Sequence, residues 1–514
     1  VLCAGLDKFY GDGAALWQAA GKHSAVLCEN FARTVPDVRL TATVNMPAHA
    51  LPPWAGEVRA LAEELEQECA VLLQNKGALP LARAAKIAYI GGFAEKPRYQ
   101  GGGSSHINAS AVTSALDAAR VNGTDVVYAE GFPADRDETD EAKFAAAVEA
   151  ARAADAAIIF AGLPDSFESE GYDRSHMRLP ECQDRLIARV AAVQPNTVVV
   201  LHNGSPVECP WAESVNAVLE MYLGGQGVGA AADALLYGDA NPSGRLPETF
   251  PYQLEDNPSH LNFPGDGKNV EYAEGVFVGY RYYDKKKMAV RWPFGHGLSY
   301  TTFEYSNVRV SADVLNDGGT VTVYADIKNT GDRAGREVVQ LYVADRTGTA
   351  GRPEKELKGF AKVALEPGET KTVELSVDAR SLSWYSEALG GWYAAPGRYE
   401  LLVGHSSRDI RGAAAVEFRT EKLLPFHVDE NTTVGELLAD PRTASSVRQM
   451  ARQFMDTIAP AAEDSADAAK EAVSDEMARQ MMDNMPLRGL RSFGAFPEGA
   501  LERMIADLNA KMAQ

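Results

Sequence analysis

The sequence predicts an α/β domain with a doubly wound sheet, followed by an all-β sandwich and a helical C-terminal tail. Three observations favour this order. Short apolar runs alternate with helical stretches up to about residue 240, strands of alternating polarity fill residues 302–420, and Met-rich helical segments follow. Alternating strands and helices are typical of a parallel sheet covered on both faces. About seven short strands separated by turns are typical of a β-sandwich.

We divide the 514 residues into a leading segment (1–75), the α/β domain (76–245), an extended connection (246–300), the sandwich (301–420) and the helical tail (421–514). The end of the leading segment, residues 56–75, has the apolar spacing of an amphipathic helix. In the tail, a stripe of Met at helical spacing is expected to pack. The acidic stretch 461–476 is expected to be a solvated linker or helix face.

Five apolar runs predict the strands of the α/β domain: KIAYIGG (86–92), DVVYAEG (125–131), AAIIFAG (156–162), NTVVVLHNG (196–204) and NAVLEMYLG (216–224). Helices are predicted between them at 140–154 and 182–193, where apolar residues recur at helical spacing. The connection 246–300 is rich in Pro, Gly, Asn and aromatic residues. Because exposed aromatic rings are unfavourable in water, this irregular segment is expected to pack on its neighbours.

Strands in the sandwich and helices in the tail are predicted from the same kinds of pattern. Strands of alternating polarity are predicted at 304–314, 319–331, 336–346, 370–377 and 397–407, with turn signals such as NDGG and EPGE between them. In the tail, helices are predicted at 446–458, 475–485 and 498–512.

Composition narrows the possible partners. The formal net charge is −21, which disfavours binding to nucleic acid and to anionic membrane surfaces. There is no apolar run of 18 residues, so no membrane span is expected. The five cysteines form no CxxC pair, and no metal site or cofactor is predicted. Free thiols, together with a first segment that lacks a secretory pattern, predict a cytoplasmic protein.

The charged stretch FESEGYDR directly follows the apolar run AAIIFAG. In open parallel sheets, ligands bind outside the C-terminal ends of the strands, which is where this stretch must lie. Glu168 and Glu170 are therefore candidate functional carboxylates, and Arg174 is expected to brace the loop by pairing with Asp173 or another carboxylate. The alternative is a solvated loop without a function.

A second stretch at the same edge, RYQGGGSSHIN (98–108), follows the strand predicted at 86–92. Its glycines let the backbone approach a ligand closely. The stretch lacks the GK[ST] and GxGxxG patterns of phosphate-binding loops, so a turn that lines a crevice is the better interpretation. Ser104 and Ser205 lack a GxSxG context, and His106 and His202 are expected to be structural.

Five runs in this order resemble glycoside hydrolase family 3, and most of all its bacterial β-glucosidase branch: GGGSSHIN, SFESEGYDRSHMRLP, VVVLHNGSPVECPW, NPSGRLPETFP and PFGHGLSYTTFEYS. The resemblance covers about residues 56–425, and NTTVGELL (431–438) in the tail is also similar. It implies that the sandwich is fibronectin type III-like. It also implies a retaining exo-β-glycosidase that hydrolyses terminal β-D-glucosyl residues.

The resemblance assigns roles to residues. In that family an N-terminal (β/α) barrel carries the aspartate nucleophile, and a glutamate on a loop of the α/β domain is the general acid/base. The EGxDR-type motif matches Glu170, and Glu168 is the alternative because loop lengths vary within the family. Further side chains are expected to bind substrate or to brace the loop: Phe167, Tyr172, Asp173, Arg174, Ser104, Ser105 and His106. To hold a proton near neutral pH, Glu170 would need a pKa raised by desolvation.

The sequence departs from the family at its beginning. A (β/α) barrel needs roughly 200 residues, and only residues 1–75 precede the α/β domain. AGLD (4–7) resembles the last barrel segment, but no counterpart of the nucleophile motif follows, so the nucleophile is unknown.

Three hypotheses stay open at this point. The barrel belongs to another chain of a split enzyme, the sequence is a fragment of a longer protein, or the chain is a non-catalytic carbohydrate-binding or scaffold relative. Expected partners are a β-glucoside, an oligosaccharide, a β-xyloside or another β-glycoside, with a separate barrel chain or a homo-oligomer. A covering partner predicts an exposed apolar patch on the crevice face of the α/β domain.

Overall fold

The structure is a computed structural model that describes residues 55–109, 111–448, 475–492 and 499–512. The AGLD motif, Cys3 and Cys28 lie outside the described residues, as do most of the helix predicted at 446–458 and most of the acidic stretch 461–476. The chain divides into two compact units. One comprises Val1–Leu382 and Ala395–Arg419, and the other Ser383–Ala394 and Thr420–Gln514.

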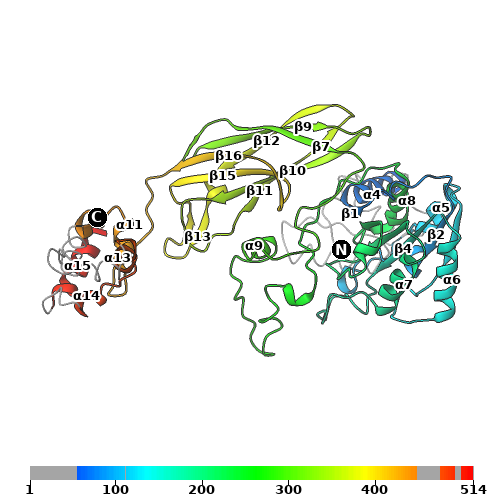
Figure 1. Ribbon diagram of the computed structural model, residues 1–514, viewed down its shortest axis with the longest axis horizontal. Helices are drawn as coiled ribbons and strands as arrows, with labels where there is room; N and C mark the ends of the chain where they lie inside the picture. Colours follow the sequence, from blue (N-terminus) through cyan, green and yellow to red (C-terminus); the bar gives the residue numbers. More distant parts are fainter. Residues whose placement is uncertain (1–54, 110, 449–474, 493–498, 513–514) are drawn as a thin grey trace, which may run out of the picture. The chain divides into compact units, whose positions relative to one another are not determined.

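The α/β domain of the first unit is built on a six-stranded sheet of order β1-β6-β5-β4-β2-β3 (Figure 1). Its strands are β1 (Val71–Asn75), β2 (Ile87–Ile90), β3 (Val126–Ala129), β4 (Ala156–Gly162), β5 (Thr197–His202) and β6 (Ala217–Glu220). Strands β2 to β6 run parallel to one another. The five predicted strands are confirmed, and all seven residues of β4 are buried, as expected of a strand covered on both faces.

Helices form a layer on each side of this sheet: α4 (Ala55–Cys69), α5 (Ala115–Val121), α6 (Glu141–Arg152), α7 (Glu181–Ala191) and α8 (Val228–Tyr237). Helices α6 and α7 pack together, and α4 and α5 both pack on α8. Local chemistry sets where they begin. The Asp140 carboxylate accepts the backbone N–H groups of Ala142 and Lys143 at the start of α6, and Ser114 with Asp117 forms a capping box on α5.

The helix predicted over 56–75 is confirmed only up to Cys69. Residues 71–75 form β1, which pairs antiparallel with β6, so the sheet is mixed rather than wholly parallel. Val71, Leu72 and Leu73 are almost completely buried. A short apolar run of this kind fits a buried strand as well as a buried helix turn, and periodicity alone does not distinguish them.

The β-sandwich consists of a five-stranded sheet, β11-β10-β15-β16-β8, and a three-stranded sheet, β12-β9-β7. The strand bounds are β7 (Phe303–Val310), β8 (Val314–Asn316), β9 (Thr320–Asn329), β10 (Gly335–Asp345), β11 (Glu356–Leu365), β12 (Thr370–Asp378), β15 (Gly397–Ser406) and β16 (Asp409–Arg419). The predicted alternation is clear on β9, where Val321, Val323, Ala325 and Ile327 are buried. Strands β8, β11 and β16 were not predicted.

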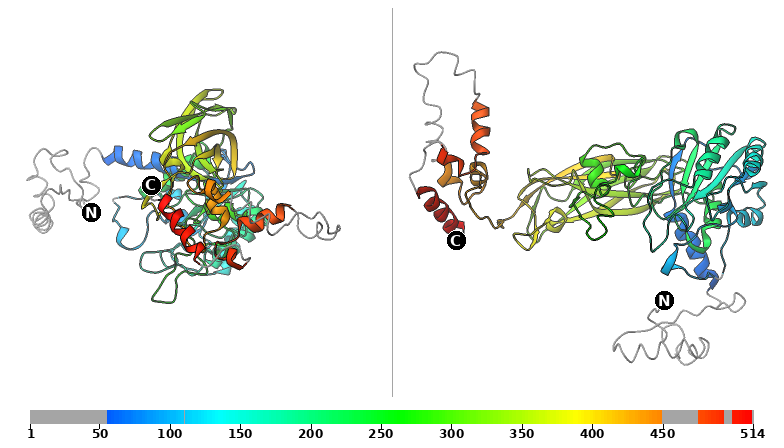
Figure 2. Two further views of the ribbon diagram at one scale, coloured as in Figure 1. Left: turned by 90° about the vertical axis from the view of Figure 1, so that its left-hand side faces the viewer. Right: turned by 90° about the horizontal axis from the view of Figure 1, so that it is seen from below.

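The second unit contains the hairpin β13 (Trp384–Ser386) and β14 (Gly391–Tyr393) and the short helices α11 (Val434–Ala439), α13 (Asp475–Asp483), α14 (Gly489–Ser492) and α15 (Ala500–Met512), the last two in red in Figure 2. Its small core includes Val434, Leu437 and Leu508. The expected packing of the Met stripe is confirmed for Met482, which is buried. It is wrong for Met477 and Met481, which are about half exposed.

Within the described part of the chain, no helix combines the length and apolar character needed to cross a membrane. Cys182 and Cys209 are buried free thiols, and Cys69 is free but exposed.

The connection 246–300 is packed at its ends and exposed in its middle. Phe250 and Trp292 form a backbone bridge and an edge-on ring contact with centroids 5.8 Å apart. Between them lie a short helix, α9 (Tyr280–Lys285), and side chains such as Leu261 and Tyr272, which are 92% and 87% exposed. The prediction of a packed connection is therefore wrong for residues around 261–278.

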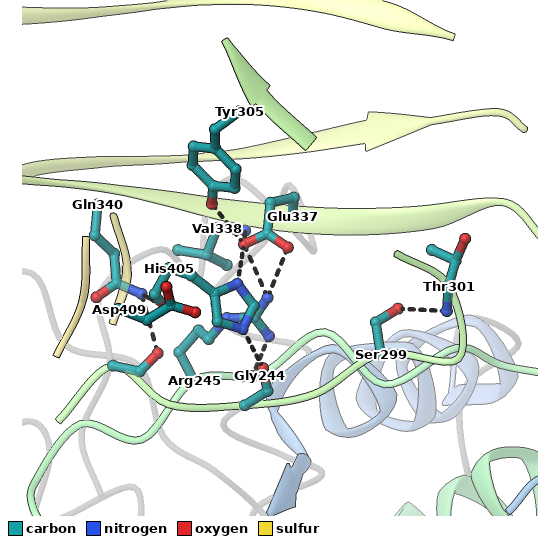
Figure 3. A network of polar contacts seen from close by, with 12 residues as sticks. Gly244, Arg245, Ser299, Thr301, Tyr305, Glu337, Val338, Gln340, His405 and Asp409 are labelled. Atoms are coloured by element: carbon teal, nitrogen blue, oxygen red, sulfur yellow. Dashed lines mark hydrogen bonds and ion pairs between the residues drawn. The ribbon is translucent and has the colours of Figure 1, made fainter. Parts of the chain in front are cut away.

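A buried network of polar groups joins the connection to the β-sandwich (Figure 3). The carboxylate of Glu337, on β10, is fully buried and accepts hydrogen bonds from Arg245 Nη2 at 3.0 and 3.1 Å and from the Tyr305 hydroxyl at 3.0 Å. The ring of His405, on β15, lies between Glu337 Oε1 (3.0 Å) and the Gly297 carbonyl (2.8 Å). Desolvation opposes the charge on Glu337, but Arg245 and His405 outweigh it and lower its pKa to about 2.

We predict that Glu337→Gln lowers the free energy of unfolding by about 3 kcal/mol at neutral pH, because it leaves the Arg245 charge buried without its counter-ion. The folded-state pKa lies below the ordinary value of 4.5. The stabilisation is thus present above that pH and is lost as the pH falls toward 2. Urea unfolding between pH 7 and pH 2 measures both effects. The exposed Glu304→Gln on β7 is the matched control, and equal stability of the Glu337→Gln protein and the wild type at pH 7 would contradict the prediction.

Candidate active site

Three loops meet at the C-terminal edge of the parallel strands. The loop that carries FESEGYDR leaves β4 at Gly162, the glycine-rich stretch follows β2, and residues 203–206 follow β5. Strand β4 pairs with β2 on one side and with β5 on the other, in parallel register. The three loops therefore emerge side by side, as the sequence predicts for a ligand crevice.

Glu168 is held inside this cluster of loops. Its Oε2 lies 2.6 Å from Arg98 Nη1 and accepts the backbone N–H of Gly204 at 2.7 Å. Its Oε1 accepts the hydroxyl of Ser205. The Glu168 and Arg98 side chains are only 16% and 6% exposed, so water screens their attraction weakly. A carboxylate engaged in this way favours a bracing role over proton transfer.

Arg174 was expected to pair with Asp173 or another carboxylate, and its carboxylate partner is Glu168. Its Nη1 donates to Ser205 Oγ at 2.7 Å and to the Pro206 carbonyl at 3.0 Å, and lies 3.9 Å from Glu168 Oε1. Asp173 is exposed and has no ion pair among the described residues. The pairing with Asp173 is thus not found, because the backbone turns the Asp173 side chain toward solvent while Arg174 points inward.

Glu170 has a different environment from Glu168. Its side chain is exposed, and it accepts the backbone N–H of Ser104 in the glycine-rich stretch. Gly103 makes this approach possible, since its φ of +87° disfavours side chains and a Cβ there would overlap Glu170. Hydrogen bonds from the Ser104 side chain and backbone lower the pKa of Glu170. The raised pKa that an acid role requires is not found here, because nothing in the described part of the chain removes the carboxyl group from water.

Two aromatic residues fasten the loop. Phe167 packs on the domain core and contacts the His176 ring edge-on, with centroids 5.8 Å apart. The half-exposed Tyr172 donates its hydroxyl to the Asp165 carbonyl. Both contacts are internal to the loop and agree with a bracing role for these two residues.

The glycine-rich stretch is held by its own contacts. His106 is exposed, with Nδ1 3.1 Å from Gln100 Nε2, and the Ser105 hydroxyl reaches only the Gly102 carbonyl, at 3.5 Å. His202, in contrast, is buried between Phe93 and Phe160, and burial lowers its pKa to about 4. It is a neutral core residue, as expected.

The sequence gives no role to Arg98, and it considers Ser205 only as a candidate nucleophile. In the structure both residues are hydrogen-bond partners of Glu168. The sequence also gives no role to Glu248, whose pKa burial raises to about 7. Arg98 opens the stretch RYQGGGSSHIN, and a lone Arg beside glycines at a strand end was the available signal. Among the described residues, no group of three His, Cys, Asp or Glu side chains is placed to hold a metal ion.

Comparison with known protein families agrees with this architecture. Residues 70–300 match the glycosyl hydrolase family 3 C-terminal domain, and residues 337–407 match the fibronectin type III-like domain. The chain belongs to glycoside hydrolase family 3. The first match begins just before β1, so the antiparallel edge strand is part of the family domain.

Relatives of this family 3 chain include the thermostable beta-glucosidase B of Acetivibrio thermocellus, 44% identical over 455 residues, which are 87% of this chain and 59% of the relative. An exo-alpha-(1->6)-L-arabinopyranosidase of Bifidobacterium breve is 40% identical over 88% of this chain and 58% of its own length. The crystal structure of a Bifidobacterium adolescentis GH3 beta-glucosidase superposes with a TM-score of 0.72 and 41% identity, covering 81% of this chain and 60% of that one. The chain thus spans less than two thirds of these relatives.

The two glutamates should respond differently to neutralisation. We predict that Glu168→Gln lowers the free energy of unfolding by about 3 kcal/mol, because Arg98 loses the counter-ion of a largely buried pair. Glu170→Gln, at an exposed position, should leave the unfolding free energy nearly unchanged. Urea denaturation of the two variants beside the wild type measures this, and a larger loss in Glu170→Gln would overturn the assignment of Glu168 as the brace.

Proposed function

We propose that this chain supplies Glu170 as the general acid/base of a retaining exo-β-glycosidase that acts on terminal β-D-glucosyl residues. The observation that carries the proposal is the contrast between the two neighbouring carboxylates. Glu168 is immobilised by Arg98, Gly204 and Ser205, whereas Glu170 reaches solvent at the ligand-binding edge of the sheet. A proton donor must reach the glycosidic oxygen, and of the two only Glu170 has an exposed side chain, held by Ser104 alone among the contacts described.

The reaction needs two protonation states of the same residue. In the first step protonated Glu170 gives its proton to the leaving oxygen, while a second carboxylate attacks the anomeric carbon and forms a glycosyl-enzyme ester. In the second step the Glu170 carboxylate removes a proton from water, which attacks the anomeric carbon and releases the sugar. Glu170 loses one proton in the first step and gains one in the second, so it ends in its protonated form.

The nucleophile must come from a (β/α) barrel, either N-terminal to these domains in a longer protein or on a separate chain. Both arrangements agree with relatives that are longer than this chain. A barrel placed over Glu170 would exclude water from the carboxyl group and thereby raise its pKa. A non-catalytic carbohydrate-binding or scaffold role remains the competing hypothesis, because it needs no barrel.

The choice of sugar rests on the relatives' names. Several are β-glucosidases, which favours β-D-glucosides. A second candidate substrate is an α-L-arabinopyranoside, since two relatives carry that activity in their names at 40% and 44% identity. β-Xylosides are a third. A cytoplasmic location stays a prediction from the sequence.

We predict that Glu170→Gln, assayed in the chain joined to or mixed with a family 3 barrel, hydrolyses 4-nitrophenyl β-D-glucoside about 10²–10⁴-fold more slowly than the wild type. It should keep a larger share of its rate on 2,4-dinitrophenyl β-D-glucoside, because that leaving group departs without a proton. Azide, which needs no general base, should restore turnover and give a β-glucosyl azide. Stopped assays with product analysis measure all three.

The control for that experiment is Glu168→Gln at a temperature where the variant is folded. If Glu168 only braces the loop, azide should not rescue this variant and its rate should not depend on the leaving group. Azide rescue of Glu168→Gln but not of Glu170→Gln would transfer the role to Glu168. Sugar binding without turnover in every assembly would favour the non-catalytic hypothesis.

The pH dependence of the assembled enzyme gives a further prediction. In this chain alone, the Ser104 hydrogen bonds hold the pKa of Glu170 below its usual value of 4.5. Catalysis needs the protonated acid, so kcat/KM must fall on the alkaline side of the pKa of Glu170 in the free enzyme. We expect this limb well above pH 4.5 when the barrel is present, and we expect it to disappear in Glu170→Gln. A limb at or below pH 4.5 would contradict desolvation by the barrel.

A further inference from the structure

A cavity of about 540 Å³ lies beside the acid/base loop, within the first unit. Its walls come from three segments: residues 174–177 of that loop, residues 205–206 after β5, and parts of the connection between 248 and 283. This volume lies within the range of small-molecule sites. Glu170 is not among the lining residues, so the cavity is distinct from the proposed acid/base position.

Polar atoms on this wall lack partners. Within the described residues, Arg174 Nη2, His176 Nδ1 and Thr249 Oγ1 are buried and form no hydrogen bond. All three residues line the cavity. Buried polar groups are nearly always hydrogen-bonded, and leaving one unsatisfied is destabilising. Three such atoms around one cavity indicate a surface built to hold a ligand with several hydroxyl groups.

The rest of the wall is apolar. Pro206, Pro251, Leu254, Pro258 and Val278 line the cavity, together with the buried ring of Tyr283. A pyranose ring has the matching character, with C–H groups on its faces and hydroxyl groups around its edge. Apolar walls with a few placed polar groups are what small-molecule sites use for affinity and for orientation.

The charges disfavour an anionic ligand. The Arg174 guanidinium lies 3.9 Å from Glu168, and two carboxyl groups of the lining, Glu248 and Glu274, lie on the same cavity. The chain also carries a formal net charge of −21. An incoming phosphate or carboxylate would meet this negative field, whereas an uncharged polyol would not.

We propose that this cavity is a second carbohydrate site, which takes a neutral glycoside of one or two pyranose rings. Thr249, His176 and Arg174 contact the hydroxyl groups of the ligand, and the Glu248 carboxyl group accepts a hydrogen bond from it. The lining prolines and the Tyr283 ring cover one face of a pyranose ring. The site does not depend on the proposed glycosidase activity, because no residue of the reaction's proton transfer belongs to it. The cavity adjoins the acid/base loop, because Arg174 both lines the cavity and braces that loop.

The test is isothermal titration of the 514-residue chain with methyl β-D-glucopyranoside, using Thr249→Val and the control Thr197→Val. Valine keeps the shape of threonine and removes the hydroxyl. In the free protein, Thr249→Val should raise the melting temperature by about 2 °C, because an unsatisfied buried hydroxyl is removed. It should also weaken the affinity about tenfold, the loss of about one hydrogen bond.

The control separates this effect from a general effect of Thr→Val. The Thr197 hydroxyl is buried in the same domain but donates to the Gln194 carbonyl at 2.6 Å. Thr197→Val should therefore lower the melting temperature and leave the affinity unchanged. A second variant, Val278→Trp, fills the cavity from its partly exposed rim and should abolish binding in a protein that stays folded.

Four results would overturn the proposal. These are absence of binding by the wild type, equal affinity of Thr249→Val and the wild type, binding that survives Val278→Trp, and binding of D-glucuronate but not of the methyl glucoside. The variant Glu170→Gln distinguishes binding in the cavity from binding beside the acid/base residue. Its affinity should equal that of the wild type, and a loss as large as that of Thr249→Val would place the sugar in the acid/base crevice instead.

Discussion

The ion pair between Glu168 and Arg98 ties together the loops that follow two neighbouring strands, and the geometry of the candidate site depends on it. Arg98 lies beyond β2 and Glu168 beyond β4, while the Gly204 N–H and the Ser205 hydroxyl reach the same carboxylate from beyond β5. Because the three strands pair in fixed parallel register, these groups meet at one edge of the sheet. Glu170, two residues further on, is thereby held at the same edge of the sheet.

This arrangement assigns opposite tasks to two similar side chains. Glu168 is stabilised as a buried partner of arginine, and Glu170 remains exposed with a lowered pKa. An exposed, readily ionised carboxyl group is a poor proton donor at neutral pH, so under the proposed function this chain supplies one of two catalytic carboxyl groups and needs a partner domain to complete the site. Under that proposal the barrel brings both the nucleophile and an apolar cover. The Glu337–Arg245 network holds one end of the connection 246–300. The central part of that connection lines the cavity proposed as a carbohydrate site.

The sequence predicted what depends on local pattern and missed what depends on distant partners. The buried strands were evident because each is an apolar run bounded by Gly or Asn, and the position of FESEGYDR followed from β4. The strand at Val71–Asn75 was mistaken for helix because its partner β6 is far along the chain. For Arg174 the sequence left the carboxylate partner open between Asp173 and another residue, and the structure shows Glu168 together with groups after β5. Glu170 lacks a raised pKa because burial is a property of the assembled site and is not encoded in one loop.

The most direct test of the account is a crystal structure of these domains assembled with their barrel and a substrate analogue. A retaining enzyme needs its two carboxyl groups about 5–5.5 Å apart. We predict that separation between Glu170 and a barrel aspartate across the anomeric carbon, with Glu168 still bound to Arg98. A barrel aspartate at that distance from Glu168, or a Glu170 side chain directed away from the sugar, would contradict the account.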